Sequence, residues 1–386
     1  MLNSNNEIKE LLKKGQIEEI DTEERQLSDL VKNSKADNRL KQLYSWFLYY
    51  RYIQNVDFSK GVPIAKVDEI VELSNSKYSA HKVTILKLLK YLKGVEEWGK
   101  MELWLKKLDP KQLSDERWKD STGKEYPSDK ERYYSYKSKV LFKTQNYSDC
   151  IVLCEEALKE IKFSPLSKND LWIKRWMALS KSKIGLHDES IKINLDILNA
   201  DKYFIYKELG DEYAITNNQK SALKYYSLAL LSKDGQIEKK GSVLKKLLNL
   251  LTNRDELELV IKLLIKIQKK NDLFIDDSLV VRAKEIGFDV DSGESIQNLD
   301  SLLCQKLVLY TYGGPMFSGE ITNVLGEGHS GFIKSSEKSY YFNKNDFIDR
   351  RHIPKIGEKV NFYLEKRFNA KKNSMDDSAV AICINN

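Results

Sequence analysis

The sequence predicts a multidomain protein in which an all-α helical-repeat superhelix is followed by a small five-stranded β-barrel. From Glu7 to about Phe288, apolar residues recur with helical spacing almost throughout. After Asp300, glycine becomes dense, and β-branched and aromatic residues alternate with polar ones, as is typical of short strands. The polar run from Asp289 to Asp300 separates these two patterns, and we interpret it as a linker.

Four regions follow from these patterns. We expect an N-terminal α-helical region at 1–130, helical repeats at 131–288, a linker at 289–300 and a β-barrel at 301–386. A chain of 386 residues is long enough for two or three domains. The run 109–130 is rich in Pro, Gly, Ser and charge, so it predicts a surface loop or short hinge before the repeats.

The composition of the chain indicates the cellular compartment in which the protein works. No stretch approaches the roughly 20 apolar residues of a membrane span, and the N-terminus lacks the apolar core of a signal peptide. The four cysteines form no disulfide framework, which suits a reducing compartment. We therefore expect a cytoplasmic protein that does not contact membranes. A net charge of +7 tolerates a polyanionic partner, and the Lys-, Asn- and Ile-rich composition suggests a bacterial source.

One repeat is clear in the sequence. From Tyr203 to Asp234, small and aromatic residues are spaced as in two antiparallel helices that cross at a turn at Asn217 and Asn218. The first helix carries Tyr206, Leu209, Gly210 and Tyr213, and the second carries Ala222, Tyr226 and Ala229. This segment resembles a tetratricopeptide (TPR) repeat. Gly210 and Ala222 are small where the helices would cross, and the tyrosines would fill the gaps alongside.

The same spacing recurs more loosely at 131–158 and 171–198, with a degenerate version at 242–269. The resemblance implies a concave groove, lined by the first helix of each repeat, that holds a protein partner. The residues expected to face the groove are Arg132, Lys139, Arg175, Lys207 and Asp211. A basic groove suits an acidic peptide or a nucleic-acid backbone; ordinary solvated helix charges are the alternative.

Five short segments of strand-like alternation lie in the C-terminal part. They start at Ile321, Gly331, Tyr340, Val360 and Ala379. Five short strands in a segment of this length is the strand number of an OB-type barrel. The order of the motifs, Gly319-Glu-Ile, Gly331-Phe-Ile, an aromatic strand and Gly357-Glu-Lys-Val, resembles a cold-shock domain.

Cold-shock domains bind single-stranded RNA or DNA by stacking bases on aromatic side chains of two adjacent strands. The resemblance places Phe332 and Tyr341 at the positions of two such aromatics, and basic residues nearby could hold phosphates. The expected nucleic-acid-binding residues are Phe332, Tyr341, Asn343, Lys334, Arg350, Arg351, Lys366, Arg367, Lys371 and Lys372.

Three positions depart from the cold-shock pattern. Ser330 stands where the family has an aromatic residue, Asn343 where it usually has His, and Asn323 where it usually has Trp. A stacked base contributes roughly 1–3 kcal/mol, so these losses predict weaker binding without affecting the fold.

No catalytic constellation is found. Cys150 and Cys154 are four residues apart on a helix, but they fall at packing positions of the repeat, with no further ligand spaced to complete a metal site. The glycine-rich run 326–331 joins two strands and does not open a helix, so it is not a phosphate loop. We expect no enzyme activity, no cofactor and no metal.

The sequence therefore predicts an adaptor that docks a protein partner through its helical repeats and binds RNA or single-stranded DNA through its barrel. The alternative is a purely protein-binding scaffold whose barrel has lost nucleic-acid binding. Such a scaffold could be an accessory subunit of a bacterial defence or stress system. The sequence leaves the oligomeric state open.

Overall fold

The structure is a computed structural model that describes residues 4–32, 37–73, 78–271, 277–287, 293–312, 315–326, 328–336, 338–349, 352–369 and 374–385. The chain forms two compact units, unit 1 at Met1–Ile193 and unit 2 at Asn194–Asn386. Among the described residues, none of the helices combines the length and the apolarity needed to cross a bilayer.

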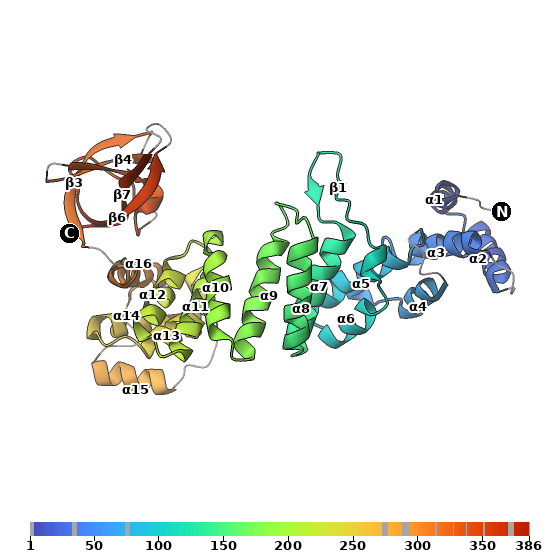
Figure 1. Cartoon of the computed structure of the whole chain (residues 1–386), viewed down its shortest axis with the longest axis horizontal. Helices are drawn as coiled ribbons and strands as arrows, with labels where there is room; N and C mark the ends of the chain where they lie inside the picture. The colour runs from blue at the N-terminus through green and yellow to red at the C-terminus, as the bar shows by residue number, and fades with distance from the viewer. Residues whose placement is uncertain are drawn as a thin grey trace. The chain divides into compact units, whose positions relative to one another are not determined.

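Unit 1 is helical (Figure 1). Its α-helices are α1 (Asn5–Lys14), α2 (Ile17–Lys32), α3 (Asn38–Tyr52), α4 (Ile64–Leu73), α5 (His81–Gly94), α6 (Trp98–Leu105), α7 (Asp129–Lys143), α8 (Tyr147–Glu160) and α9 (Asn169–Lys183). The helix α10 (His187–Asp196) crosses the boundary between the units. One continuous apolar core runs through unit 1, from Ile8 to Met177. The loop predicted at 109–130 contains the short helix η2 (Pro110–Gln112) and a hairpin of β1 (Trp118–Lys119) and β2 (Glu125–Tyr126).

The helices of unit 2 continue the repeat pattern. They are α11 (Tyr203–Ile215), α12 (Gln219–Leu231), α13 (Gly241–Leu248), α14 (Arg254–Lys270), α15 (Asp277–Ile286) and α16 (Ile296–Leu307). The turn between α11 and α12 falls at Asn217 and Asn218, as the sequence predicts. A Cβ on Gly210 would lie 2.5 Å from the ring of Tyr226, so this glycine lets α12 approach α11 closely. The mostly helical, TPR-like prediction for this part of the chain is confirmed.

The C-terminal strands close into a barrel. They are β3 (Phe317–Leu325), β4 (Ser330–Ser335), β5 (Lys338–Asn343), β6 (Lys359–Asn369) and β7 (Ser374–Ile384), in the spatial order β3-β4-β5-β7-β6. All neighbours are antiparallel except β5 and β7, which are parallel. The barrel interior is apolar and is filled by residues including Ile321, Ile333, Phe342 and Phe362. The predicted five-stranded OB-like barrel is therefore confirmed.

The start of the barrel differs from the prediction. Helix α16 occupies the end of the segment expected to be a linker (289–300) and the beginning of the segment expected to be barrel (301–386). Leu299, Leu303 and Leu307 are fully buried because they recur at helical spacing and pack into the same core as α14. The first barrel strand begins only at Phe317.

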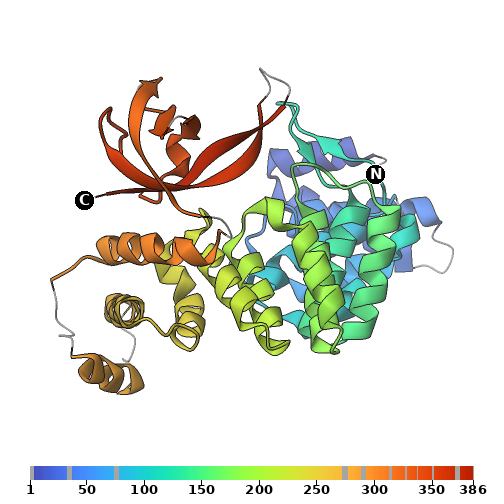
Figure 2. The same cartoon turned by 60° about the vertical axis from the view of Figure 1, so that its left-hand side comes forward.

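Within unit 2, the barrel is joined to the helices by a second, smaller apolar cluster. Tyr363 and Val380 on β6 and β7 are buried together with Val308 of the short helix η5 (Val308–Tyr310). Tyr312 stacks on Tyr363 at 5.1 Å between ring centroids. Figure 2 shows the long β6–β7 hairpin beside α16. This side of the barrel is covered by helices, whereas the β4–β5 side is not part of this cluster.

Candidate nucleic-acid interface

The outward face of β4 and β5 carries the aromatic pair predicted from the sequence. Along β4, Gly331 and Ile333 are buried in the barrel, so the intervening Phe332 points outward. Along β5, Phe342 is buried and Tyr341 is 41% exposed. Phe332 and Tyr341 are direct partners in the antiparallel ladder, and their rings lie 5.7 Å apart at 69°. Two adjacent aromatic side chains therefore share one open face.

Gly331 allows this face to form. A Cβ at this position would lie 2.2 Å from the carbonyl oxygen of Asn323 and 2.6 Å from the ring of Phe342. Only the absence of a side chain lets β3 approach β4 closely while Phe342 fills the barrel beneath them.

Three rows of outward side chains cross the face. Strand pairing aligns Asn323 with Phe332 and Tyr341 in the central row. One neighbouring row consists of Glu320, Lys334 and Ser339, and the other of Leu325, Ser330 and Asn343. Lys334 is exposed beside the aromatic pair, where an ammonium group can meet a phosphate. Leu325 is 41% exposed and was not predicted; its alternation with Asn323 along β3 was the signal that could have found it.

Asn343 lies on this face but is engaged in a turn. Its side-chain oxygen accepts a hydrogen bond from the N–H of Asn345 at 3.0 Å, and its own N–H donates to Asp346 at 2.7 Å. These bonds form a capping box at the short helix η6 (Lys344–Asp346). The predicted role of Asn343 in binding remains a prediction, and the structure gives it a local structural role.

The predicted phosphate-binding cations are distributed differently. Arg350, Arg351, Lys371 and Lys372 lie outside the described residues. Lys366 is exposed on β6 and is aligned with Asp377 of β7. Arg367 forms ion pairs with Asp346 at 2.9 Å and Glu365 at 2.8 Å. Burial lowers the pKa of Arg367, but the two carboxylates outweigh it and the pKa is raised. The positive charge of the Arg367 guanidinium, which lies on the helical side of the barrel, is therefore already neutralised by these two carboxylates.

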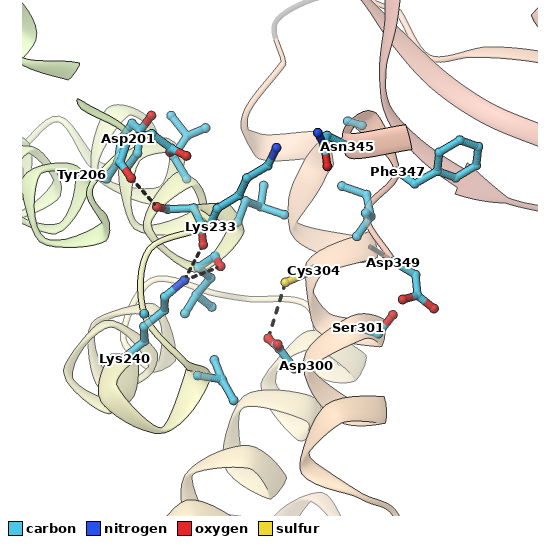
Figure 3. A pocket seen from close by; sticks show the side chains of 18 of the residues that line it. Asp201, Tyr206, Lys233, Lys240, Asp300, Ser301, Cys304, Asn345, Phe347 and Asp349 are labelled. Carbon is cyan, nitrogen blue, oxygen red and sulfur yellow. Dashed lines mark hydrogen bonds between the residues drawn. The ribbon is translucent and has the colours of Figure 1, made fainter. Parts of the chain in front are cut away.

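A cavity of about 800 Å³ lies between the barrel and the helices of unit 2, beside the apolar cluster that joins them. Figure 3 shows its helical wall, with Asp201, Lys240 and Cys304, facing Asn345 and Asp349 of the barrel. Lys240 is almost fully buried and donates to the carbonyl oxygens of Leu230 and Ser232 at 3.0 and 2.7 Å. Its ammonium group therefore caps the C-terminal end of α12.

Carboxylates outnumber cations among the residues that line this cavity. Two of its cations, Arg367 and Lys270, are paired with Glu365 and Glu238. Such a lining repels phosphate and favours a role in joining the barrel to the helices. Within the described part of the chain, no group of three His, Cys, Asp or Glu side chains is placed to hold a metal ion.

The predicted groove residues belong to three helices. Arg132 and Lys139 lie on α7 and Arg175 on α9, all in unit 1, whereas Lys207 and Asp211 lie on α11 in unit 2. Arg132 lies 3.7 Å from the carboxylate of Asp129.

Lys207 and Asp211 form an ion pair at 2.6 Å. Asp211 also accepts a hydrogen bond from the Tyr226 hydroxyl at 2.8 Å and lies 3.2 Å from Lys246. Burial raises the pKa of Asp211, but the bonds from Lys207 and Tyr226 outweigh it, so the pKa is lowered. This pair ties α11 to the helices that follow, and its predicted partner contact remains a prediction.

Cys150 and Cys154 are both buried, with their sulfur atoms 4.0 Å apart. The thiol of Cys150 donates to the carbonyl oxygen of Ser138 at 3.3 Å, across the α7–α8 contact. The hydrogen bond with Cys150, together with burial, raises the pKa of Cys154. These features agree with the packing role expected from the sequence.

Comparison with known proteins finds similarity only among solved structures. No protein-family model matches the chain, and no curated protein matches it. A human IFIT1 dimer with PPP-AAAA is 10% identical with a TM-score of 0.39, over 76% of this chain and 66% of that one. A monomeric IFIT1 mutant with Gppp-AAAA is 10% identical with a TM-score of 0.34, over 75% of this chain and 59% of that one. This chain thus spans less than two thirds of either protein.

Proposed function

We propose that this protein is a non-enzymatic adaptor whose barrel binds RNA or single-stranded DNA through the β4–β5 face. The observation that carries the proposal is the pair of outward aromatic side chains, Phe332 and Tyr341, in direct register on adjacent strands. In barrels of this strand order, the face of the second and third strands is a common oligonucleotide-binding surface. Bases stack on such rings with little sequence preference.

The surroundings of the pair support this use. The opposite side of the barrel, around Tyr363 and Val380, is buried against helices of unit 2 and is not accessible to a strand. Lys334 adds a positive charge next to the rings, but Glu320 is its partner across the ladder. A face with two aromatic rings and little net charge predicts weak binding that depends more on stacking than on phosphate contacts.

The helical repeats have the second role in this proposal, which is to dock a protein partner. Binding of nucleic acid by the barrel would then be strengthened through effective concentration when both parts engage one assembly. A nucleic-acid-binding adaptor of this kind would work in the cytoplasm.

The test is binding of fluorescein-labelled single-stranded RNA and DNA to the full chain, measured by fluorescence anisotropy at low and moderate salt. The double variant Phe332→Ala/Tyr341→Ala should bind at least about 30-fold more weakly, since each lost stack costs roughly 1–3 kcal/mol. The matched control is Leu302→Ala/Leu309→Ala, which removes two exposed apolar side chains of the same unit, on α16 and η5 and outside the barrel strands. This control should bind as the unaltered chain does.

Two results would contradict the proposal. Equal binding by the double variant and the unaltered chain would place the nucleic-acid site elsewhere. Absence of binding at low salt would favour the alternative of a purely protein-binding scaffold.

A further inference from the structure

Unit 1 contains a surface where three lysines lie over aromatic rings. Helices α5 and α7 contribute Lys93, Lys139 and Lys143, and we call these three residues the cation row. The ammonium of Lys139 lies 4.6 Å from the ring centre of Trp98 and 5.8 Å from that of Trp176. Lys143 lies 5.7 Å from the Trp98 ring centre.

The third member is held in the same way. Lys93 lies 5.4 Å from the ring centre of Tyr136. Arg175 on α9 lies nearby, with its guanidinium 5.0 Å from the ring of Trp176 and 5.4 Å from that of Trp172, but it has further interactions and is not counted in the row. Cation–π contacts hold the three ammonium groups of the row in position without neutralising their charge.

Lys139, which is the one partly buried lysine of the row, differs from other lysines of unit 1 that are not exposed. Lys66 lies between Glu24 and Glu69, and Lys181 between Glu155 and Glu189. No carboxylate of the described residues lies within 4 Å of the ammonium groups of Lys93, Lys139 or Lys143. Their charge is therefore available to an external anion.

The cations are close enough to repel one another. Burial lowers the pKa of Lys139, and the charges of Lys93, Lys143 and Arg175 lower it further, while Glu96 opposes them. Burial also lowers the pKa of Lys93. An anion that lies along the row would relieve this repulsion, so the surface is arranged for a multivalent anion.

The rings beneath the cations decide which anion fits. Ammonium or guanidinium groups already lie over the indole rings of Trp98, Trp172 and Trp176, in the place that a stacked base would take on that side of each ring. A nucleic-acid strand would bind through phosphates alone and would gain none of the stacking that single-strand sites use. Carboxylates need only the outward-pointing N–H donors that the row presents.

We propose that the cation row binds an acidic segment of a partner protein, whose Asp and Glu side chains contact Lys93, Lys139 and Lys143. This inference rests on the proposed docking role of the helical repeats and specifies the site and the chemistry of the partner. Arg132, paired with Asp129, and Lys207, paired with Asp211, lie outside the row.

The test is anisotropy of a short fluorescein-labelled oligoglutamate peptide with the full chain at low salt. The variant Lys93→Gln/Lys139→Gln/Lys143→Gln should bind about tenfold more weakly or worse, because it removes three positive charges that would contact the peptide. The matched control, Lys106→Gln/Lys159→Gln/Lys192→Gln, removes the same charge from exposed positions of unit 1 and should bind as the unaltered chain does. Glu96→Gln should tighten binding about twofold.

Three outcomes would overturn the inference. The first is that the row variant binds the peptide as tightly as the unaltered chain does, or that none of the chains binds the peptide. A second is equal weakening by the control variant, which would show non-specific charge attraction. The third is loss of single-stranded RNA binding, in place of peptide binding, in the row variant. The Phe332→Ala/Tyr341→Ala chain should keep peptide binding, so failure of the barrel proposal is distinguishable from failure of this one.

Discussion

At the scale of single residues, Asn323 marks the incomplete part of the candidate interface. It lies directly opposite Phe332 on β3, in the same row as Tyr341, and it is exposed. The cold-shock resemblance implies a tryptophan at this position. Strand pairing shows that a large ring here would extend the aromatic row from two strands to three.

We therefore predict that Asn323→Trp tightens single-stranded RNA binding. One added stack of about 1–3 kcal/mol corresponds to roughly 5- to 150-fold in the dissociation constant. Fluorescence anisotropy with the full chain measures this gain. Asn323→Ala is the control and should produce no gain. An Asn323→Trp chain that folds normally and binds no better would show that bases do not stack on this face.

A second residue-scale prediction concerns Gly210. An alanine there would place its Cβ 2.5 Å from the ring of fully buried Tyr226, so the two helices must separate. Gly210→Ala should lower the free energy of unfolding by about 1–3 kcal/mol, measured by urea denaturation. Gly94→Ala, at the end of α5, is the control because its Cβ would meet nothing within 4 Å. Similar losses in both variants would refute the crossing role of Gly210.

At the scale of elements, the turns between paired helices share one conformation. The central residues Glu96, Gln145, Gly185 and Asn217 all have positive φ, from 58° to 84°. In each turn the next N–H bonds back to a carbonyl in the last turn of the first helix, as from Asn146 to Leu141 at 2.8 Å. These are Schellman caps, which favour glycine or asparagine at the left-handed position. Two of the four turns carry neither residue.

Gln145→Gly should therefore stabilise the α7–α8 pair. Its side chain is exposed, and glycine adopts the observed φ of 63° without the steric cost that glutamine pays. We expect the free energy of unfolding to rise by about 0.5–1 kcal/mol, measured by urea denaturation. Gln145→Ala keeps the Cβ and should not stabilise the protein. A gain in the alanine variant would rule out this backbone explanation.

At the scale of the whole molecule, the two units differ in their tryptophan content and therefore in their intrinsic fluorescence. All six tryptophans, from Trp46 to Trp176, lie in unit 1. Tryptophan fluorescence therefore reports the unfolding of unit 1 alone, whereas far-ultraviolet circular dichroism reports both units.

We predict that the two signals do not coincide during urea unfolding, because two compact units with separate cores need not unfold together. Gly210→Ala, in unit 2, should shift part of the dichroism transition and leave the tryptophan transition in place. A tryptophan transition that moves equally with the dichroism signal would show that the units unfold as one.

Local patterns were sufficient to predict most elements. Helical spacing predicted the pair from Tyr203 to Leu231, and period-two alternation predicted all five barrel strands with Phe332 and Tyr341 facing outward. Helix α16 was missed because the search for a boundary relied on glycine density, whereas Leu299, Leu303 and Leu307 carry a helical repeat of their own.

Pairing between distant side chains required the tertiary structure. Arg367 was predicted to hold phosphate, but folding places Asp346 beside it, and Lys139 meets Trp98 and Trp176 from two other helices. The sequence by itself determined that a helical-repeat part precedes five short barrel strands, since local periodicity reports which side of each element is buried. The tertiary structure alone decided which charges are neutralised and which stay available, because an ion pair or cation–π contact depends on distances between segments far apart in the chain.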